Sequence, residues 1–169
     1  LSIARDITRR KQMEEQRKYD EQVQQILYEI AKTSMSEKAL DYLLIVVRRE
    51  LSKVMDTTNF YAALYRPETD TLRKIIFVNE KFAIEGWNAE KSFSGQLIRS
   101  GKTILLNHDG ILRFAEEKGL NLPVTPAACW LGVPLMDGQK AIGVVVVQSY
   151  TDENAYDEKS ARLLAMIAH

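Results

Sequence analysis

The chain has 169 residues, enough for one domain of ordinary size. Apolar residues make up 46% of it and charged residues 27%, so it can build a hydrophobic core and stay in solution. The 23 basic and 23 acidic side chains cancel, which argues against a nucleic-acid-binding module and against an acidic disordered tail. The longest apolar runs, 42–47 and 141–147, are far shorter than the roughly 20 residues that cross a bilayer.

Cysteine and histidine are scarce. The single cysteine, Cys129, rules out an internal disulfide, and with only two histidines we expect no metal site. A reducing compartment fits this composition, so we expect a cytoplasmic location, although the parent protein can be membrane-anchored elsewhere. The sequence starts at Leu1 and stops at His169, directly after a predicted helix, so we expect a piece of a longer protein.

The first 34 residues are predicted to form a helix. Residues 9–25 are almost wholly charged or amide, and apolar residues then recur at steps of four, three and four, the spacing of a coiled-coil seam. The seam consists of Tyr19, Val23, Ile26 and Ile30. Two interpretations stay open: a parallel homodimer formed through this seam, or an amphipathic helix that packs on its own domain.

A second helix is predicted to begin at Ser34, since Glu37 three residues later completes a capping-box pattern. One face of this helix is apolar and predicts a core position. That face carries Leu40, Leu43, Leu44, Val47, Leu51 and Val54.

From Asn59 onward the pattern becomes that of strands and short helices. Residues 60–65 and 72–78 are predicted strands joined by a turn into a hairpin. A short helix over 94–100, ended by Gly101, and a short strand over 103–106 follow. Asp109 is then predicted to cap a helix that ends at Gly119.

The last third predicts a second hairpin and a final helix. Strands over 129–136 and 141–148 are joined through Asp137-Gly138, a strong hairpin signal. Asp157 is predicted to cap a helix carrying Leu163, Leu164 and Ile167. Because successive strands are joined by hairpins, we expect an antiparallel sheet in an α+β fold and not a doubly wound parallel one.

Two segments resemble GAF domains. Residues 130–149 (WLGVPLMDGQKAIGVVVVQS) resemble the C-terminal half of that family, in which a strand turns through a glycine and returns as an Ile-Gly-Val strand. Residues 93–107 resemble its middle element, and Asp157-Glu158 resembles the opening of its last helix. The resemblance implies a GAF domain over 34–169, with the N- and C-terminal helices on one sheet face and short helices and loops on the other.

Residues 4–15 (ARDITRRKQMEE) resemble the exit of a PAS domain, where a last strand ends and passes into a charged linker helix. Asp6 and Thr8 are both natural helix N-caps. The resemblance implies that 1–33 are a PAS exit motif and linker helix. It also implies a sensor histidine kinase of a two-component system, whose phosphorelay passes to a response regulator. A GAF domain that regulates a cyclase, phosphodiesterase or transcription activator is the alternative.

No catalytic constellation is evident, so we expect no enzyme activity from this chain. His108, beside Asp109, fits a surface or capping role, and Cys129 fits a buried, inert thiol on a core strand. GAF domains that reduce methionine sulfoxide depend on several cysteines, and this chain has one. A covalent bilin is disfavoured because Cys129 has no neighbouring histidine. Gln148-Ser149 stands where cyclic-nucleotide-binding members carry Asn-Lys, which weakens that interpretation.

The resemblance also implies a cavity for an unidentified small molecule between the sheet and its cover. Aromatic walls with a few polar groups suit such a ligand, although the same aromatics could simply fill the core. The predicted cover comprises Phe82, Trp87, Phe93, Gln96, Asp109 and Phe114, and the sheet would add Phe77 and Trp130.

Overall fold

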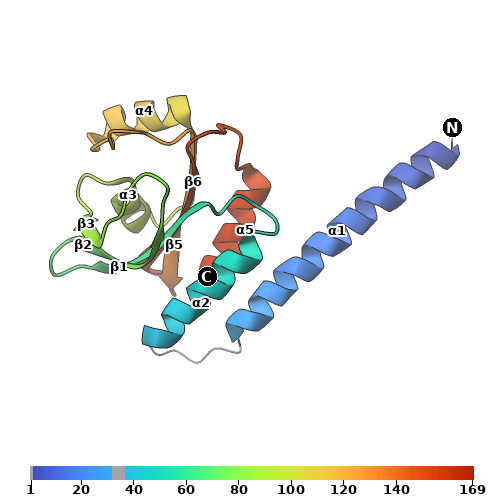
Figure 1. Ribbon diagram of the computed structural model, residues 1–169, viewed down its shortest axis with the longest axis horizontal. Helices are drawn as coiled ribbons and strands as arrows, with labels where there is room; N and C mark the ends of the chain where they lie inside the picture. Colours follow the sequence, from blue (N-terminus) through green and yellow to red (C-terminus); the bar gives the residue numbers. More distant parts are fainter. Residues whose placement is uncertain (1, 32–36) are drawn as a thin grey trace.

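The computed structural model describes residues 2–31 and 37–169, and the side chains of residues 2–24 and 39–169 (Figure 1). It confirms the predicted α+β class. The helices are α1 (Ser2–Ala31), α2 (Glu37–Leu51), α3 (Phe93–Ser100), α4 (His108–Lys118) and α5 (Glu158–Ala168). The strands are β1 (Asn59–Arg66), β2 (Thr71–Val78), β3 (Gly86–Asn88), β4 (Ile104–Asn107), β5 (Cys129–Asp137) and β6 (Lys140–Ser149).

The strands form one antiparallel sheet in the order β3-β2-β1-β6-β5-β4. Both predicted hairpins, β1–β2 and β5–β6, are confirmed. Gly138 in the second turn has a φ of 60°, which explains why glycine stands there. The three-residue edge strand β3 was not predicted, because Gly86-Trp-Asn88 is too short to show a strand period.

The central strands alternate between two hydrophobic cores. Phe60, Cys129 and Val145 face a core shared with α2 and α5. Their strand neighbours Tyr61, Trp130 and Val144 face a second core, on the side of α3 and α4. Both faces of the sheet are therefore covered, which explains why β5 and β6 are apolar at nearly every position.

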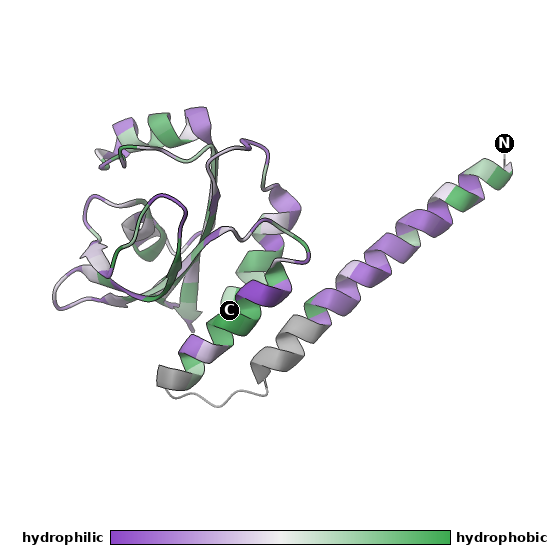
Figure 2. Cartoon of the chain, in the orientation of Figure 1, coloured by the Kyte–Doolittle hydropathy of each residue, from purple (hydrophilic) through white to green (hydrophobic). Residues whose placement is uncertain are grey.

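Helices α2 and α5 form the layer on the first face. Leu44, Val47 and Leu51 of α2 are buried there, with Leu163 and Leu164 of α5, as the sequence pattern predicted. In Figure 2 α2 carries a broad hydrophobic face beside its charged residues, whereas α1 is mostly hydrophilic.

Only the C-terminal part of α1 contacts this layer, and its N-terminal part extends away from the rest of the chain (Figure 1). Val23 is 8% exposed and joins the core of α2 and α5. Tyr19 packs on α5, where the Lys159 ammonium lies 4.1 Å from the centre of its ring. Tyr19 and Val23 thus face their own domain, as expected if α1 is an amphipathic helix that packs on its own domain. The side chains of Ile26 and Ile30 lie outside the described residues.

Three predicted helix ends are confirmed. Gly101 and Gly119 end α3 and α4 in the left-handed conformation, with φ of 62° and 64°. Asp157 caps α5 in a capping box with Ser160. The cap of α3 is Ser92, which was not predicted. The predicted cap at Ser34 lies outside the described residues.

The caps predicted at Asp109, Asp6 and Thr8 are wrong. Asn107, and not Asp109, caps α4: its Oδ1 accepts a hydrogen bond from the Gly110 N–H at 2.8 Å, because the helix begins directly at the end of β4. Asp6 and Thr8 start no helix, because α1 already begins at Ser2, and the Thr8 hydroxyl donates to the Ala4 carbonyl at 2.9 Å. Within the described residues this segment pairs with no strand, so its backbone groups bond within the helix.

Candidate functional site

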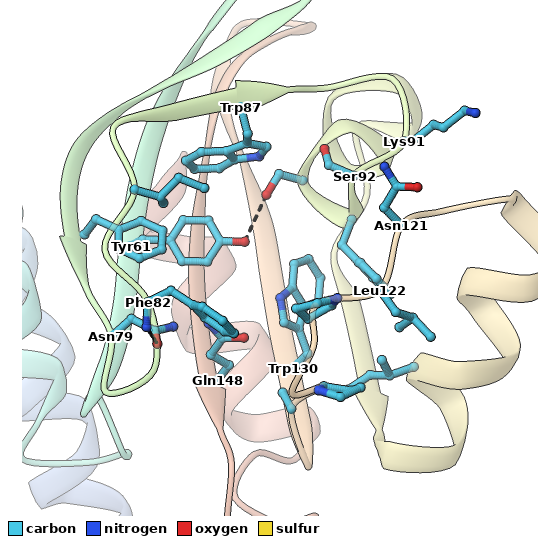
Figure 3. Close-up of a pocket in the computed structure, with 18 of the residues that line it drawn as sticks. Tyr61, Asn79, Phe82, Trp87, Lys91, Ser92, Asn121, Leu122, Trp130 and Gln148 are labelled. Carbon is cyan, nitrogen blue, oxygen red and sulfur yellow. Dashed lines mark hydrogen bonds between the residues drawn. The ribbon is translucent and has the colours of Figure 1, made fainter.

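A cavity of about 500 Å³ lies on the second face of the sheet, between β1, β5 and β6 and the covering helices and loops (Figure 3). Volumes of this size are typical of small-molecule sites. The lining residues are Tyr61, Phe77, Asn79, Phe82, Ala83, Ile84, Trp87, Asn88, Lys91, Ser92, Phe93, Ser94, Ile111, Asn121, Leu122, Pro123, Pro126, Ala127, Trp130, Gln148 and Tyr150.

One wall is an aromatic cluster built by strand register. Tyr61 of β1 is paired with Phe77 of β2, so both rings project from the same face and stack with centroids 5.2 Å apart. Trp87 on β3 meets the Tyr61 ring edge-on at 5.5 Å. The short strand β3, although it adds few hydrogen bonds to the sheet, thereby places an indole at the cavity.

Trp130 and Phe93 form a second wall, with ring centroids 5.6 Å apart. Trp130 comes from β5, and its indole lies over Gly132 of the same strand. A Cβ at Gly132 would lie 2.5 Å from Cη2 of Trp130. The missing side chain therefore allows the indole to lie against the sheet.

Hydrogen bonds hold two covering loops. The Oδ1 of Asn79 accepts from the backbone N–H groups of Lys81 and Phe82, at 2.7 and 3.0 Å, while its Nδ2 donates to the Tyr150 hydroxyl at 2.8 Å. The second loop follows α4, and the Asn121 N–H anchors it to the Lys91 carbonyl at 2.9 Å. Both loops carry partly exposed apolar side chains, Phe82 and Leu122.

The one buried hydroxyl pair in the lining joins Tyr61 and Ser94, whose oxygens lie 2.9 Å apart (dashed in Figure 3). Burial raises the pKa of Tyr61 to about 12, while hydrogen bonds with Ser94 and Trp130 act in the opposite direction. The phenol therefore stays protonated at neutral pH. Desolvation of this size indicates an interior that disfavours charge.

Five of the eight predicted site residues line the cavity: Phe77, Phe82, Trp87, Phe93 and Trp130. Gln96, Asp109 and Phe114 do not. Asp109 is exposed on the first turn of α4, and Phe114 lies behind Phe93, with ring centroids 5.9 Å apart. Gln96 is half-buried on α3 but lines no part of the cavity.

Several lining residues were missed, notably Tyr61, Ser94, Gln148 and Tyr150. The two-residue period of β1 and β6 could have found Tyr61 and Gln148, since both share a face with buried neighbours of the second core. Ser94 and Tyr150 lie at the end of an element, where no periodicity identifies the direction of a side chain.

Cys129 lies on the opposite face of the sheet from the cavity. It is 1% exposed, belongs to the core of α2 and α5, and burial raises its pKa. As Cys129 is the only cysteine of the chain, no thiol reaches the cavity. His108 is half-buried, and its Nδ1 lies 3.0 Å from the Ala127 carbonyl oxygen. Residues 2–31 and 37–169 contain no group of three or more side chains suited to bind a metal ion.

The fold and the cavity define an α+β module with helices packed on one face of the sheet and a cavity on the other. The family model described as GAF domain matches residues 20–169. The chain therefore belongs to the GAF domain family, a regulatory and sensory fold. In the described part of the chain, no helix combines the length and apolar character needed to cross a bilayer.

Solved structures of varied function share this fold. The chain is similar to the GAF domain of an Acinetobacter phosphoenolpyruvate-protein phosphotransferase, with 19% identity and a TM-score of 0.69 over 88% of this chain and 86% of that one. A free methionine-R-sulfoxide reductase from Neisseria meningitidis, in complex with its substrate, has 20% identity and a TM-score of 0.67, over 89% and 83%. A methyl-accepting chemotaxis protein has 13% identity and a TM-score of 0.65, over 85% and 90%. No curated protein sequence matches the chain.

Proposed function

We propose that this chain is the ligand-sensing domain of a larger signal-transduction protein. The observation that carries the proposal is the cavity of about 500 Å³ on one face of a sheet whose other face is packed by α2, α5 and part of α1. A ligand that touches Trp130 touches β5, and the next residue, Leu131, packs in the helix core. A ligand that prefers one position of β5 can therefore bias the position of the helices.

The output proposed for the parent protein is a histidine kinase of a two-component system, located in the cytoplasm and passing its signal to a response regulator. The PAS-like residues 4–15, followed by a GAF domain, support this output. A cyclase, a phosphodiesterase or a transcription activator is the alternative. The coding sequence after residue 169 tests the choice, because a kinase requires a phosphoacceptor histidine and an ATP-binding module there.

A parallel homodimer along α1 is part of the same proposal. Val23 is buried within its own chain, so a substitution there would not separate loss of the dimer from unfolding. The predicted seam of Tyr19, Val23, Ile26 and Ile30 therefore cannot be tested cleanly at Val23. Ile3 and Ile7, one helical turn apart and 73% and 62% exposed, lie on another face of α1 and test whether its extended part pairs with a second copy. Sedimentation should show a dimer that Ile3→Glu/Ile7→Glu dissociates. A wild-type chain that stays monomeric at high concentration, or a dimer that tolerates both substitutions, would contradict this arrangement.

Methionine sulfoxide reduction is the second candidate, because a reductase shares the fold. Reduction by a thiol would need a cysteine at the cavity, and Cys129 is buried on the other face. We expect no turnover of free methionine sulfoxide in the presence of a thiol reductant. Turnover that disappears in Cys129→Ser would reverse this conclusion.

Ligand sensing is tested by thermal-shift screening of the purified chain against a broad library of small molecules. A ligand at 100 times its Kd should stabilise the folded state by about 2.7 kcal/mol. Both tryptophans of the chain, Trp87 and Trp130, line the cavity, so tryptophan fluorescence reports directly on its occupation.

The matched pair of variants is Phe82→Ala, which changes the lining, and Phe114→Ala, which removes a phenyl ring outside it. Binding should weaken in the first variant and persist in the second. No shift from any compound, or equal loss of binding in both variants, would contradict the proposed function.

A further inference from the structure

The interior of the cavity is aromatic and nearly free of charge. Two ring clusters line it, Tyr61 with Phe77 and Trp87, and Phe93 with Trp130. A hydrogen bond between the side chains of Tyr61 and Trp130, both labelled in Figure 3, joins the two clusters. Aromatic side chains bind flat rings by stacking and edge-to-face contacts, so a planar ligand can pack on this lining.

Most polar side chains of the lining already have partners. Tyr61 and Ser94 bond to each other, and Asn79 is occupied by the loop that it holds. The Ser92 hydroxyl donates to the Ala89 carbonyl and accepts from the Gly95 N–H, both at 3.0 Å. These bonds fix the orientation of each of the four side chains.

Two carboxamides of the lining, those of Asn121 and Gln148, make no hydrogen bond to another protein group in the part of the chain that the structure describes. Asn121 is exposed, whereas Gln148 is half-buried and lies on β6, directly across from Trp130 of β5. Since no fully buried side-chain nitrogen or oxygen among the described residues lacks a partner, the Gln148 carboxamide is open to the cavity or to solvent. A carboxamide has both a donor and an acceptor, so it can pair with a ligand edge that offers the complementary two groups.

Charge on the ligand finds little support in this cavity. Lys91 is the one charged residue among the described residues that line it, and its side chain is exposed. In Figure 3 the Lys91 ammonium points away from Tyr61 and Trp87, toward the outside. An anion bound between the aromatic walls would lose its hydration without gaining an opposite charge, which is costly.

We propose that the cavity binds an uncharged, planar heteroaromatic molecule that packs on the aromatic lining and pairs its polar edge with the Gln148 carboxamide. This inference rests on the proposed sensing function and narrows it to one class of ligand. It separates this cavity from sites for phosphorylated ligands, which need cations or a cradle of backbone N–H groups within reach.

The test compares the amide and the acid of the same ring: nicotinamide with nicotinate, quinoline-2-carboxamide with quinoline-2-carboxylate, and indole-3-carboxamide with indole-3-carboxylate. Calorimetric and fluorescence titrations should show binding of at least one amide, with its acid roughly tenfold weaker. Gln148→Leu should lower the affinity for that amide about fivefold, the share of one hydrogen bond. Gln139→Leu, the same change in the exposed turn of the same hairpin, should leave it unaltered.

The outcomes separate this inference from the proposed function. An acid that binds as tightly as its amide, or an affinity that Gln148→Leu does not change, would overturn the inference while ligand sensing stands. Failure of all three amides, when other library compounds shift the melting temperature, would overturn it too. Silence of the whole library would remove the proposed function itself.

Discussion

Gly132 is the residue whose substitution tests most directly how the Trp130 wall is built. It lies in the middle of β5, paired with Ile104 on one side and Val146 on the other. An added Cβ would lie 2.5 and 2.7 Å from two carbons of the Trp130 indole, and 2.7 Å from Cδ1 of Leu97. Trp130 is 5% exposed and Leu97 fully buried, so neither can move into solvent. Gly132→Ala must therefore displace the indole into the cavity.

The expected cost follows from two opposing effects. Overpacking of a filled core destabilises by roughly 1–3 kcal/mol. Alanine recovers about 0.5–1 kcal/mol, because glycine within a strand is entropically unfavourable. The net loss of unfolding free energy is then about 0–2.5 kcal/mol, which lowers the Tm of a chain of this size by up to roughly 10 °C.

A double-mutant cycle measured by urea denaturation isolates the contact. In a Trp130→Leu background the indole is absent, and Gly132→Ala should cost nothing or stabilise slightly, giving a coupling energy of about 1–2 kcal/mol. Gly132→Ala should change the tryptophan fluorescence in the wild-type background, where the Trp130 indole is displaced. It should not do so in the Trp130→Leu background. An equal cost of Gly132→Ala in both backgrounds would show that the indole is not what requires glycine here.

Three further outcomes are expected. Asp157→Ala should destabilise α5 by about 1 kcal/mol at pH 7 through loss of its cap. Hydrogen bonds from Ser160 lower the pKa of Asp157 in the folded chain. The unfolding free energies of wild type and Asp157→Ala, measured by urea denaturation, should therefore converge as the pH falls from about 4, the ordinary pKa of an aspartate, toward the lower pKa of the folded state. A difference that stays constant with pH would contradict this. Cys129 should react with Ellman's reagent much more slowly in the folded than in the unfolded chain, since burial raises its pKa, and equal rates would refute its burial. Tyr61→Phe should lower the unfolding free energy by about 1–2 kcal/mol, because it leaves the Ser94 hydroxyl unpaired. Adding Ser94→Ala should recover part of that loss. Purely additive losses in the double variant would contradict the hydrogen bond between Tyr61 and Ser94.

The sheet could be predicted because its strands obey local rules. Asp137-Gly138 defines the β5–β6 turn, and the aromatic run after Asn59 defines β1. Strand β3 escaped prediction because its place depends on pairing with 71–73 and not on its own residues. The cap at Asn107 was missed for a related reason: the helix begins where β4 ends, and that junction is set by the pairing of β4 with β5.

The candidate site was predictable in its aromatic content but not in its polar groups. Large rings such as Trp87 and Phe93 stand out in the sequence because few other places in the fold can bury them. The two-residue period of β6 places Gln148 on the face of the second core, but a glutamine at the end of a strand is ordinary, and only Trp130 across from it shows that this position borders a cavity. Asp109 shows the opposite error, since it was assigned to the site but does not line the cavity. It lies in the first turn of α4, where its side chain is exposed to solvent.

The sheet order also determines where copies of this protein can pair strand to strand. The long apolar strands β1, β6 and β5 are all interior, while the two edges are β3 and β4, of three and four residues. Strands this short cover only part of their neighbours: β3 pairs with residues 71–73 of β2, and β4 with residues 129–132 of β5. Residues 75–78 and 133–137 therefore have no strand partner on their outer side, and these two stretches are where strand addition between copies would begin. Pro134 lies in the second stretch and has no N–H to donate, which disfavours strand addition there.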